Sequence, residues 1–296
     1  MNFLAAHPTE AFTLTEIASR VGLSNGSAHR VLTTLAESHY LSRHPKHKTY
    51  SLGMALLAIG QAALSKRQDI EIARYELRRL ADDLKTHCVA TTVANGELVI
   101  VTCAGTPQTS EPINQVGERR PFIPPLGIGC VAWAEPGEQR DYLARAPAAL
   151  SDNAKERLSQ ALQVIRERGY SIAGSGPAIR ALRQFTSLPV GYQANESYWA
   201  GLRQLLTDLS VSEIQLLDLD EVGPEGVSYI TTPVFSPSGE VVLELSLSGL
   251  LPSLGKADIA RHIERLRTAA AIVTSGTLGQ FPEHSLVPSG LRPPDT

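Results

Sequence analysis

Residues 13–52 read TLTEIASRVGLSNGSAHRVLTTLAESHYLSRHPKHKTYSL, and their patterning predicts the fold of the N-terminal part of the chain. Apolar residues first recur at helical spacing at Leu14, Ile17, Ala18 and Val21. They predict one apolar face of a short helix, which Thr13 caps and Gly22 ends. Ser24 caps a second helix, whose inward stripe is Ala28, Val31, Leu32 and Leu35. Two helices joined by a glycine-containing turn predict a helix-turn-helix.

The outward face of the second helix is small and polar, with Glu37 at its far end. Gly26 allows close backbone approach, and Arg30 can bond bidentately to guanine or bind phosphate. Free N–H groups at the start of the helix attract phosphate. On this face and at the two caps, the residues that we expect at the DNA are Thr13, Ser24, Asn25, Gly26, Ser27, His29, Arg30 and Thr33.

A wing is predicted directly after the second helix. Residues 40–43 and 49–52 are short β-rich runs, and the sequence HPKHK at 44–48 forms a basic turn between them. Lys46, His47 and Lys48 at its tip are placed to contact sugar-phosphate, which raises affinity without reading sequence.

The charge of the chain is distributed unevenly. The whole chain carries a net charge of −3. Residues 1–67 contain seven Lys and Arg against three Asp and Glu, a net charge of +4, so the other 229 residues carry −7. Five of the eight histidines also lie in the first segment. A basic N-terminal part on an acidic body is typical of electrostatic attraction to DNA.

Residues 13–61, TLTEIASRVGLSNGSAHRVLTTLAESHYLSRHPKHKTYSLGMALLAIGQ, resemble the winged helix-turn-helix of the IclR-type transcription regulators. Gly22-Leu23, His29-Arg30 and residues 50–53 (YSLG) carry most of the likeness. The sequence departs from the pattern in lacking the basic residue often found near Asn25. The resemblance implies binding of double-stranded operator DNA as a dimer or tetramer, with operator half-sites following the protein's symmetry.

The rest of the chain has an α+β pattern. Helical spacing covers residues 70–84, 151–168 and 256–275, and strands are expected on both sides of Asn95-Gly96 and at 229–235 and 241–247. We therefore expect a DNA-binding domain at 1–52, a linker helix at 53–67, a second domain at 68–279 and a disordered tail at 280–296. An insertion at about 174–213 contains helical stretches at 178–185 and 199–209. Its sequence is compatible with three roles: a lid, a dimer contact or a surface embellishment.

The second domain resembles the family's GAF-like effector module through VGERRPFIPPLGIGCVAWA and VSYITTPVFSPSGEVVLELSLSG. Ser246 and Ser248 share one face of a strand, and Gly127 precedes a short helix that adds N–H donors. Asp220 is expected to orient a hydroxyl. The bulky Tyr229 predicts either a reduced or reshaped cavity or a ligand hydrogen-bonded by its phenol. The effector contacts implied for a small acid or phenol are Leu126, Gly127, Asp220, Val227, Tyr229, Ser246 and Ser248.

Other functions are less consistent with the sequence. Gly22-Leu23-Ser24-Asn25-Gly26 matches the G-x-S-x-G motif of hydrolases, but that motif needs a preceding strand. Cys88, Cys103 and Cys130 lie far apart without zinc-ligand spacing, so no metal or cofactor is expected. No membrane span and no signal sequence is found, which predicts a cytoplasmic protein. A ligand-responsive regulator is the predicted function; a DNA-binding regulator with redox sensing or no effector, and more remotely an enzyme, are the alternatives.

Overall fold

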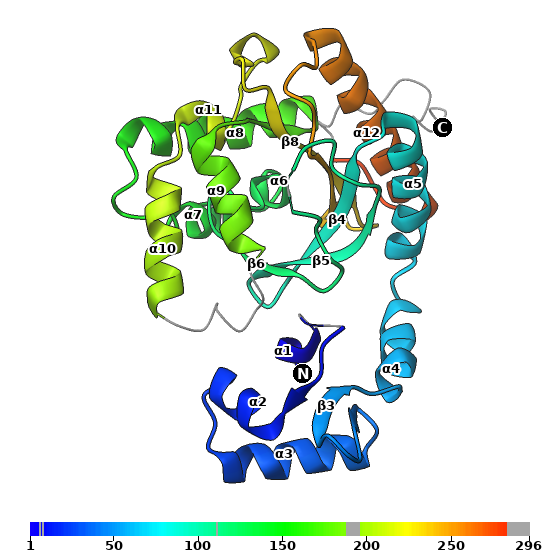
Figure 1. Ribbon diagram of the computed structural model, residues 1–296. Coiled ribbons are helices and arrows are strands. Elements are labelled where there is room, and N and C mark those ends of the chain that lie inside the picture. Colours follow the sequence, from blue (N-terminus) through cyan, green and yellow to red (C-terminus); the bar gives the residue numbers. More distant parts are fainter. Residues whose placement is uncertain (6, 8, 111, 188–195, 283–296) are drawn as a thin grey trace. The chain divides into compact units, whose positions relative to one another are not determined.

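The computed structural model describes residues 1–5, 7, 9–110, 112–187 and 196–282. These residues form two compact units (Figure 1). The first is built mainly from Met1–Gln68, and the second mainly from Asp69–Ser187 and residues 200–282. Each unit has its own sheet, so each can be described by itself.

The N-terminal unit is a winged helix-turn-helix. Its elements are α1 (Asn2–Ala5), β1 (Phe12–Thr13), α2 (Leu14–Arg20), α3 (Asn25–Glu37), β2 (Leu41–Arg43) and β3 (Thr49–Leu52), followed by α4 (Ala55–Leu64). The strands form an antiparallel sheet in the order β1-β3-β2. The core contains Phe3, Leu4, Phe12, Ile17, Ala18, Ala28, Leu32, Leu41 and Tyr50. The predicted helix pair and wing are confirmed.

Both predicted helix caps are present. Thr13 and Glu16 form a capping box, in which the Glu16 carboxylate accepts the Thr13 N–H at 2.7 Å. The Ser24 hydroxyl accepts the Ser27 N–H at 3.2 Å at the start of α3. These bonds satisfy backbone donors that a helix leaves unpaired. The turn between the helices is thereby held in place by local side chains.

Two residues of the predicted inward stripes are exposed, contrary to expectation. Val21 is 42% exposed and Val31 is 50% exposed. Val21 is the residue that caps the end of α2, so helical periodicity no longer applies to it. Val31 lies at the edge of the stripe on α3, and α3 packs mainly against α2 and β2, which cover only a narrow face centred on Ala28 and Leu32.

The second unit is built on a six-stranded antiparallel sheet in the order β6-β5-β4-β9-β8-β7. The strands are β4 (His87–Ala94), β5 (Glu97–Ala104), β6 (Arg119–Pro121), β7 (Ser171–Gly174), β8 (Val227–Phe235) and β9 (Val241–Ser248). Asn95 and Gly96 join β4 to β5 with φ values of 53° and 74°, the positive pair that a tight hairpin turn requires. The predicted α+β class is confirmed.

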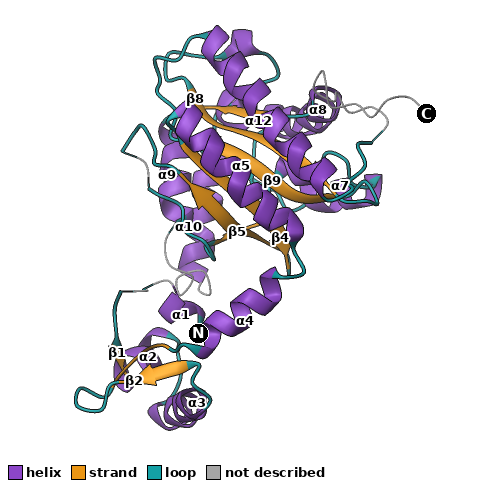
Figure 2. Cartoon of the chain, turned by 90° about the vertical axis from the view of Figure 1, so that its right-hand side faces the viewer, coloured by secondary structure: helices purple, strands orange, loops and turns teal. Residues whose placement is uncertain are grey.

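Helices cover both faces of this sheet. The long helices α5 (Gln68–Leu84) and α12 (Lys256–Gly276) lie together on one face (Figure 2). The other face carries α6 (Ile128–Val131), α7 (Pro136–Leu143), α8 (Asp152–Arg168), α9 (Pro177–Thr186), α10 (Glu196–Thr207) and α11 (Val211–Ile214) (Figure 1). The short 3-10 helix η2 (Leu219–Glu221) precedes β8. Leu245 and Leu247 are fully buried, while their neighbours on β9 point to the opposite face.

The expected insertion is helical, as predicted, and its described residues form α9, α10 and α11. The predicted disordered tail begins as packed chain, because the Gln280 N–H donates to the Ser236 carbonyl at 3.0 Å. The ring of Phe281 also lies 5.9 Å from that of Phe235. Residues 283–296 of the predicted tail lie outside the described residues.

Candidate DNA-binding surface and effector pocket

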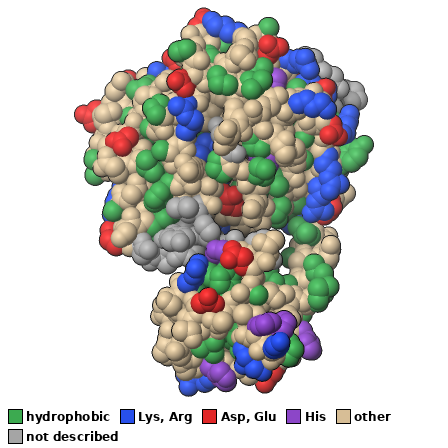
Figure 3. Space-filling model, in the orientation of Figure 1, with side chains coloured by type: hydrophobic (Ala, Val, Ile, Leu, Met, Phe, Trp, Pro, Cys, Tyr) green, Lys and Arg blue, Asp and Glu red, His purple; other side chains and the backbone are tan. Residues whose placement is uncertain are grey.

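The start of α3 presents most of the residues predicted to contact DNA. Ser24, Asn25, Gly26, His29 and Arg30 are exposed. Figure 3 shows Lys, Arg and His side chains gathered on the surface of the N-terminal unit. An exposed, basic helix start with small neighbours has the shape and charge that a DNA groove requires.

Three of the predicted contact residues are less available. Ser27 and Thr33 are half-buried. Thr13 is also half-buried, and its hydroxyl donates to the Glu16 carboxylate at 2.8 Å. The backbone and side-chain hydrogen bonds from Thr13 lower the pKa of Glu16. Thr13 therefore has a structural role as a cap, and its contact with DNA stays a prediction.

The wing tip is shaped by His44, which the sequence analysis did not single out. Its Nδ1 accepts the N–H of Lys46 at 3.3 Å and that of His47 at 3.1 Å. The rings of His44 and His47 lie 4.5 Å apart. Lys46, His47 and Lys48 are all exposed around this turn. The His-Pro pair at its start was the available signal, since an imidazole can satisfy turn N–H groups as Asn and Asp do.

The second unit holds a cavity of about 90 Å³ against the face of the sheet that carries Ser246. Strand register places its floor residues in rows. Ser248 pairs with His87 on β4 and Tyr229 on β8, while Ser246 pairs with Val89 and Thr231. Glu244 pairs with Thr91 in the next row. Because paired residues in an antiparallel sheet point to the same face, one surface collects their side chains.

Five of the seven predicted effector contacts line this cavity: Leu126, Gly127, Tyr229, Ser246 and Ser248. Leu126 and Gly127 reach it from the segment leading into α6. Their binding of an effector stays a prediction. The structure brings them together through strand alternation on β9 and β8.

Asp220 and Val227 do not line the cavity, contrary to their expected position, and their contact with an effector stays an untested prediction. Asp220 is an exposed residue of η2, where hydrogen bonding and charge from Lys256 lower its pKa. Val227 is buried opposite Gly174. It lies beyond the last β8–β9 pair, Tyr229 with Ser248, and therefore beyond the end of the pocket floor.

The cavity also contains charged residues that the sequence analysis missed: Arg120, Arg183 and Glu244. Strand alternation could have predicted Glu244, because it precedes Ser246 by two residues on the same strand and so shares its face. Arg120 lies on β6, where it pairs with Leu98 on β5. Arg183 belongs to the insertion, for which neither periodicity nor resemblance gave a position near the pocket.

Glu244 is a buried carboxyl group at one side of the cavity. Its Oε1 accepts a hydrogen bond from the Thr231 hydroxyl at 2.8 Å. Burial raises its pKa to about 7, and the bond from Thr231 opposes that change. A Cβ on Gly129 would overlap Glu244 Oε1, so a larger residue at this position of α6 would displace the carboxyl group.

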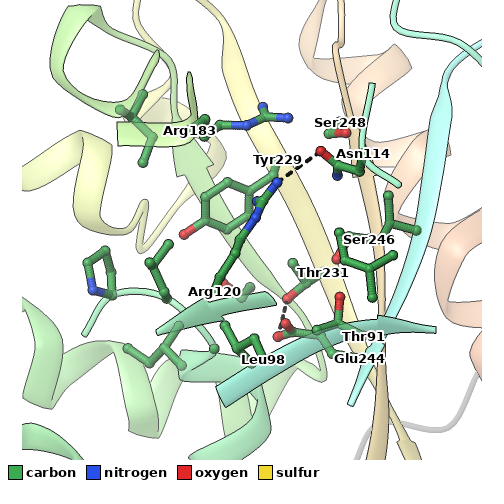
Figure 4. Close-up of a pocket in the computed structure, with 18 residues that line it drawn as sticks. Thr91, Leu98, Asn114, Arg120, Arg183, Tyr229, Thr231, Glu244, Ser246 and Ser248 are labelled. Atoms are coloured by element: carbon green, nitrogen blue, oxygen red, sulfur yellow. Dashed lines mark hydrogen bonds between the residues drawn. The ribbon is translucent and has the colours of Figure 1, made fainter. Parts of the chain in front are cut away.

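The arginines are held by defined partners. Arg120 donates to Glu118 at 2.7 Å and to Asn114 at 2.9 Å. Arg183 Nη1 donates to the Ser228 carbonyl at 3.0 Å. Tyr229 lines the same cavity in the strand row of Ser248 (Figure 4). Burial raises the pKa of its phenol, as does the nearby Glu244. The lining of the cavity therefore combines charged groups of both signs with an aromatic ring.

Comparison with known proteins agrees with this two-part architecture. Residues 1–45 match the family model for the IclR helix-turn-helix domain. The regulator XynR of Escherichia coli is 24% identical over 277 residues, which cover 90% of this chain and 89% of XynR. The regulator KdgR of the same organism is 24% identical over 88% of this chain and 84% of its own length. The N-terminal domain is therefore an IclR-type helix-turn-helix, and the whole chain is similar to transcription regulators of that family.

Solved structures support the fold over nearly the whole chain. A regulator of the family from Alicyclobacillus acidocaldarius has a TM-score of 0.64 and 23% identity, covering 93% of this chain and 94% of its own. An IclR homologue from Microbacterium hydrocarbonoxydans, complexed with 4-hydroxybenzoate, has a TM-score of 0.63 and 17% identity, covering 94% and 96%. Across the described residues, no helix of this regulator has both the length and the apolar character for crossing a bilayer.

Proposed function

We propose that this chain is a ligand-responsive regulator, which binds an operator through α3 and the wing and changes its DNA affinity when a small acidic or aromatic metabolite fills the cavity of the second unit. The observation that carries the proposal is the cavity lined by Arg120, Arg183 and Glu244 in the same chain as a helix-turn-helix. Guanidinium groups are the usual partners of carboxylates, so a cavity lined by two arginines suits a small acid. The cytoplasm is the compartment where such a regulator meets DNA.

The DNA contacts divide into two kinds. Arg30, exposed on α3, is proposed to read a base in the major groove. Lys46, His47 and Lys48 are proposed to bind phosphates, which adds affinity that depends on salt but carries no sequence information. Asn25 and Gly26 at the start of α3 would let the backbone approach the DNA closely.

Dimerisation is proposed through α4. None of its ten residues is buried in the chain. Met54 before it is 76% exposed, and Leu57 and Ile59 are 61% and 48% exposed. A helix with apolar residues on an exposed face gains stability by packing against a second copy. A dimer or tetramer would also match the symmetry of paired operator half-sites.

A small-molecule effector is favoured over redox sensing. Burial raises the pKa of Cys88 to about 12 and also raises those of Cys103 and Cys130. A thiol reacts with oxidants as the thiolate, so these cysteines are poorly placed as sensors. The curated relatives are regulators, which likewise supports a protein that is not an enzyme.

Genomic footprinting followed by titration tests the proposal. Footprinting identifies the operator, and the genes beside it name the candidate metabolite. Fluorescence anisotropy of the labelled operator is then measured with and without that metabolite. We expect salt-dependent DNA binding and a saturable change in operator affinity on adding the metabolite. Absence of sequence-specific DNA binding would contradict the regulator itself.

A further inference from the structure

The inserted segment contributes part of the pocket wall. Ile179 and Arg183 stand one turn apart on α9, so they share a helix face, and both line the cavity. Glu213 Oε1 accepts the N–H of Ala178 and of Ile179, each at 3.0 Å, which fixes the start of α9. Arg183 is 7% exposed. The insertion is therefore placed to influence what the pocket binds.

One end of the cavity is cationic. In Figure 4 the guanidinium groups of Arg120 and Arg183 point toward Asn114 and Ser248. The Ser248 side chain is 4% exposed, and its hydroxyl finds no hydrogen-bond partner among the described residues. A buried hydroxyl without a partner costs free energy, which an anionic oxygen bound at this end would recover. Guanidinium groups are also the usual partners of carboxylates.

The opposite end of the cavity is formed by Glu244, with Thr231 and Thr91 beside it (Figure 4). Thr231 occupies one carboxyl oxygen of Glu244, at 2.8 Å. The other carboxyl oxygen is available to a ligand that reaches this end. Tyr229 lies in the same strand row as Ser248, at the arginine end, because the two residues pair across β8 and β9. Apolar residues such as Leu98 and Ile100 also line the cavity.

We propose that α9 is a specificity element and that the effector is a small hydroxy acid, whose carboxylate binds Arg183 and Arg120 and whose hydroxyl binds Glu244 at the far end. This inference rests on the proposed function, because it names the ligand class of the same pocket. It adds two specificity-determining residues, Arg183 and Glu244, and a role for the insertion.

Other ligand classes fit these charges less well. A dicarboxylate would bury its second carboxylate beside Glu244, at an end of the cavity where none of the described lining residues is a cation, which is costly. An acid without a hydroxyl would leave the Glu244 carboxyl without a ligand partner, which lowers affinity by roughly tenfold. An amino acid would require ionised Glu244 and a buried ammonium group, whereas burial favours the neutral carboxyl group.

Three probe compounds test the two ends separately. Isothermal titration calorimetry on the full chain compares 4-hydroxybenzoate, benzoate, which lacks the hydroxyl, and 4-hydroxybenzyl alcohol, which lacks the carboxylate. We expect the wild type to bind 4-hydroxybenzoate about tenfold or more tightly than either of the others. Arg183→Gln should weaken both acids by about tenfold to a hundredfold and leave the alcohol unchanged. Glu244→Leu should weaken both hydroxyl compounds and leave benzoate unchanged.

Arg180→Gln is the matched control, because Arg180 lies on α9 but pairs with Glu225 at the surface. It should bind all three compounds like the wild type. If circular dichroism shows that Arg183→Gln unfolds, Arg183→Lys is used instead. This substitution keeps the charge but loses the planar guanidinium group, so it should weaken binding of both acids. Folded Arg183 variants with wild-type affinity for the acids would overturn the role of α9.

Failure of the wild type to bind any of the three compounds, or a preference for benzoate, would overturn the hydroxy-acid class. Neither result would affect salt-dependent binding of the full chain to its operator, which is measured without ligand. The two proposals therefore fail on different readouts.

Discussion

The two units of this regulator bring their candidate site residues together in different ways. In the N-terminal unit, most candidate contacts lie within α3 and the turn of the wing, a short continuous stretch of chain. In the second unit, the cavity gathers residues from Val89 to Ser248, carried by all six strands, the segment around α6, the loop containing Asn114 and the inserted helix α9. A DNA-reading surface can thus be local, whereas the ligand pocket depends on long-range register.

This difference implies different sensitivities to substitution. Residues on the exposed face of α3 can change without disturbing a core, so their variants should report DNA binding alone. Pocket residues such as Glu244 are buried in a packed interior, so their variants change stability as well as binding. Measurements that separate these effects sharpen the comparison, and the largest effect is expected in the pocket.

The pH dependence of stability should report Glu244. Its folded pKa of about 7 lies above the ordinary value of 4.5, so the folded protein holds this proton at pH values where the unfolded chain has lost it. The free energy of unfolding should therefore fall as pH rises from 4.5 to 7, by about 3 kcal/mol from this group. Glu244→Gln should remove that part of the decline, measured by urea unfolding at several pH values. Glu156→Gln, at an exposed site on α8, should leave the profile unchanged, and identical profiles for all three proteins would contradict the buried carboxyl group.

Arg30→Ala should be the strongest single change on the DNA side. If Arg30 makes one good base contact, operator affinity falls by about 1–3 kcal/mol at fixed salt, while thermal stability is unchanged because the side chain is exposed. Fluorescence anisotropy with the footprinted operator measures this. Glu37→Ala at the far end of the same helix is the control and should bind at least as well as the wild type. Unchanged binding by Arg30→Ala would remove this residue from the interface.

The sequence predicted the local unit more completely than the pocket, for physical reasons. Helical periodicity and caps are encoded over a few residues, so Thr13, Ser24 and the wing could be located. The predicted burial of Val31 was wrong, because burial on α3 depends on how wide a face its neighbours cover. In the pocket, the alternation of β9 located Ser246 and Ser248, and the same rule applied one step further would have found Glu244.

Other parts of the pocket had no local signal. Arg183 reaches the cavity only because the insertion folds back against the sheet, which periodicity cannot reveal. Asp220 was expected to orient a hydroxyl of the effector, yet η2 carries it to the surface beside Lys256. A resemblance between sequences does not reveal which way a short connecting helix turns.

The wing should contribute affinity without specificity. Lys46→Ala combined with Lys48→Ala should weaken binding to operator and to unrelated duplex alike, by about tenfold. It should also lower the slope of log affinity against log salt by about one for each phosphate that the wing no longer neutralises. Titrations at four salt concentrations measure the slope. Lys155→Ala on α8 is the control. A double variant with the wild-type slope would place the wing away from the phosphates.

The smallest expected effect is on the stability of the N-terminal unit. Ser24→Ala removes the hydroxyl that accepts the Ser27 N–H at the start of α3, and it should lower the free energy of unfolding by about 1 kcal/mol. Ser19→Ala, at an exposed position within α2, should cost little. Thermal denaturation followed by circular dichroism compares the two. Equal stability of both variants would mean that the cap contributes nothing.

The most direct test of the account is whether ligand response and DNA binding can be separated by substitution in the pocket. Operator affinity of the wild type and of the double variant Ser246→Ala with Ser248→Ala is measured by anisotropy, with and without the metabolite named by the genes beside the operator. The double variant should keep its ligand-free affinity within about tenfold, or 1.4 kcal/mol, of the wild type and should show a blunted response to the metabolite. A double variant that responds with wild-type potency would place the effector site elsewhere and contradict the account.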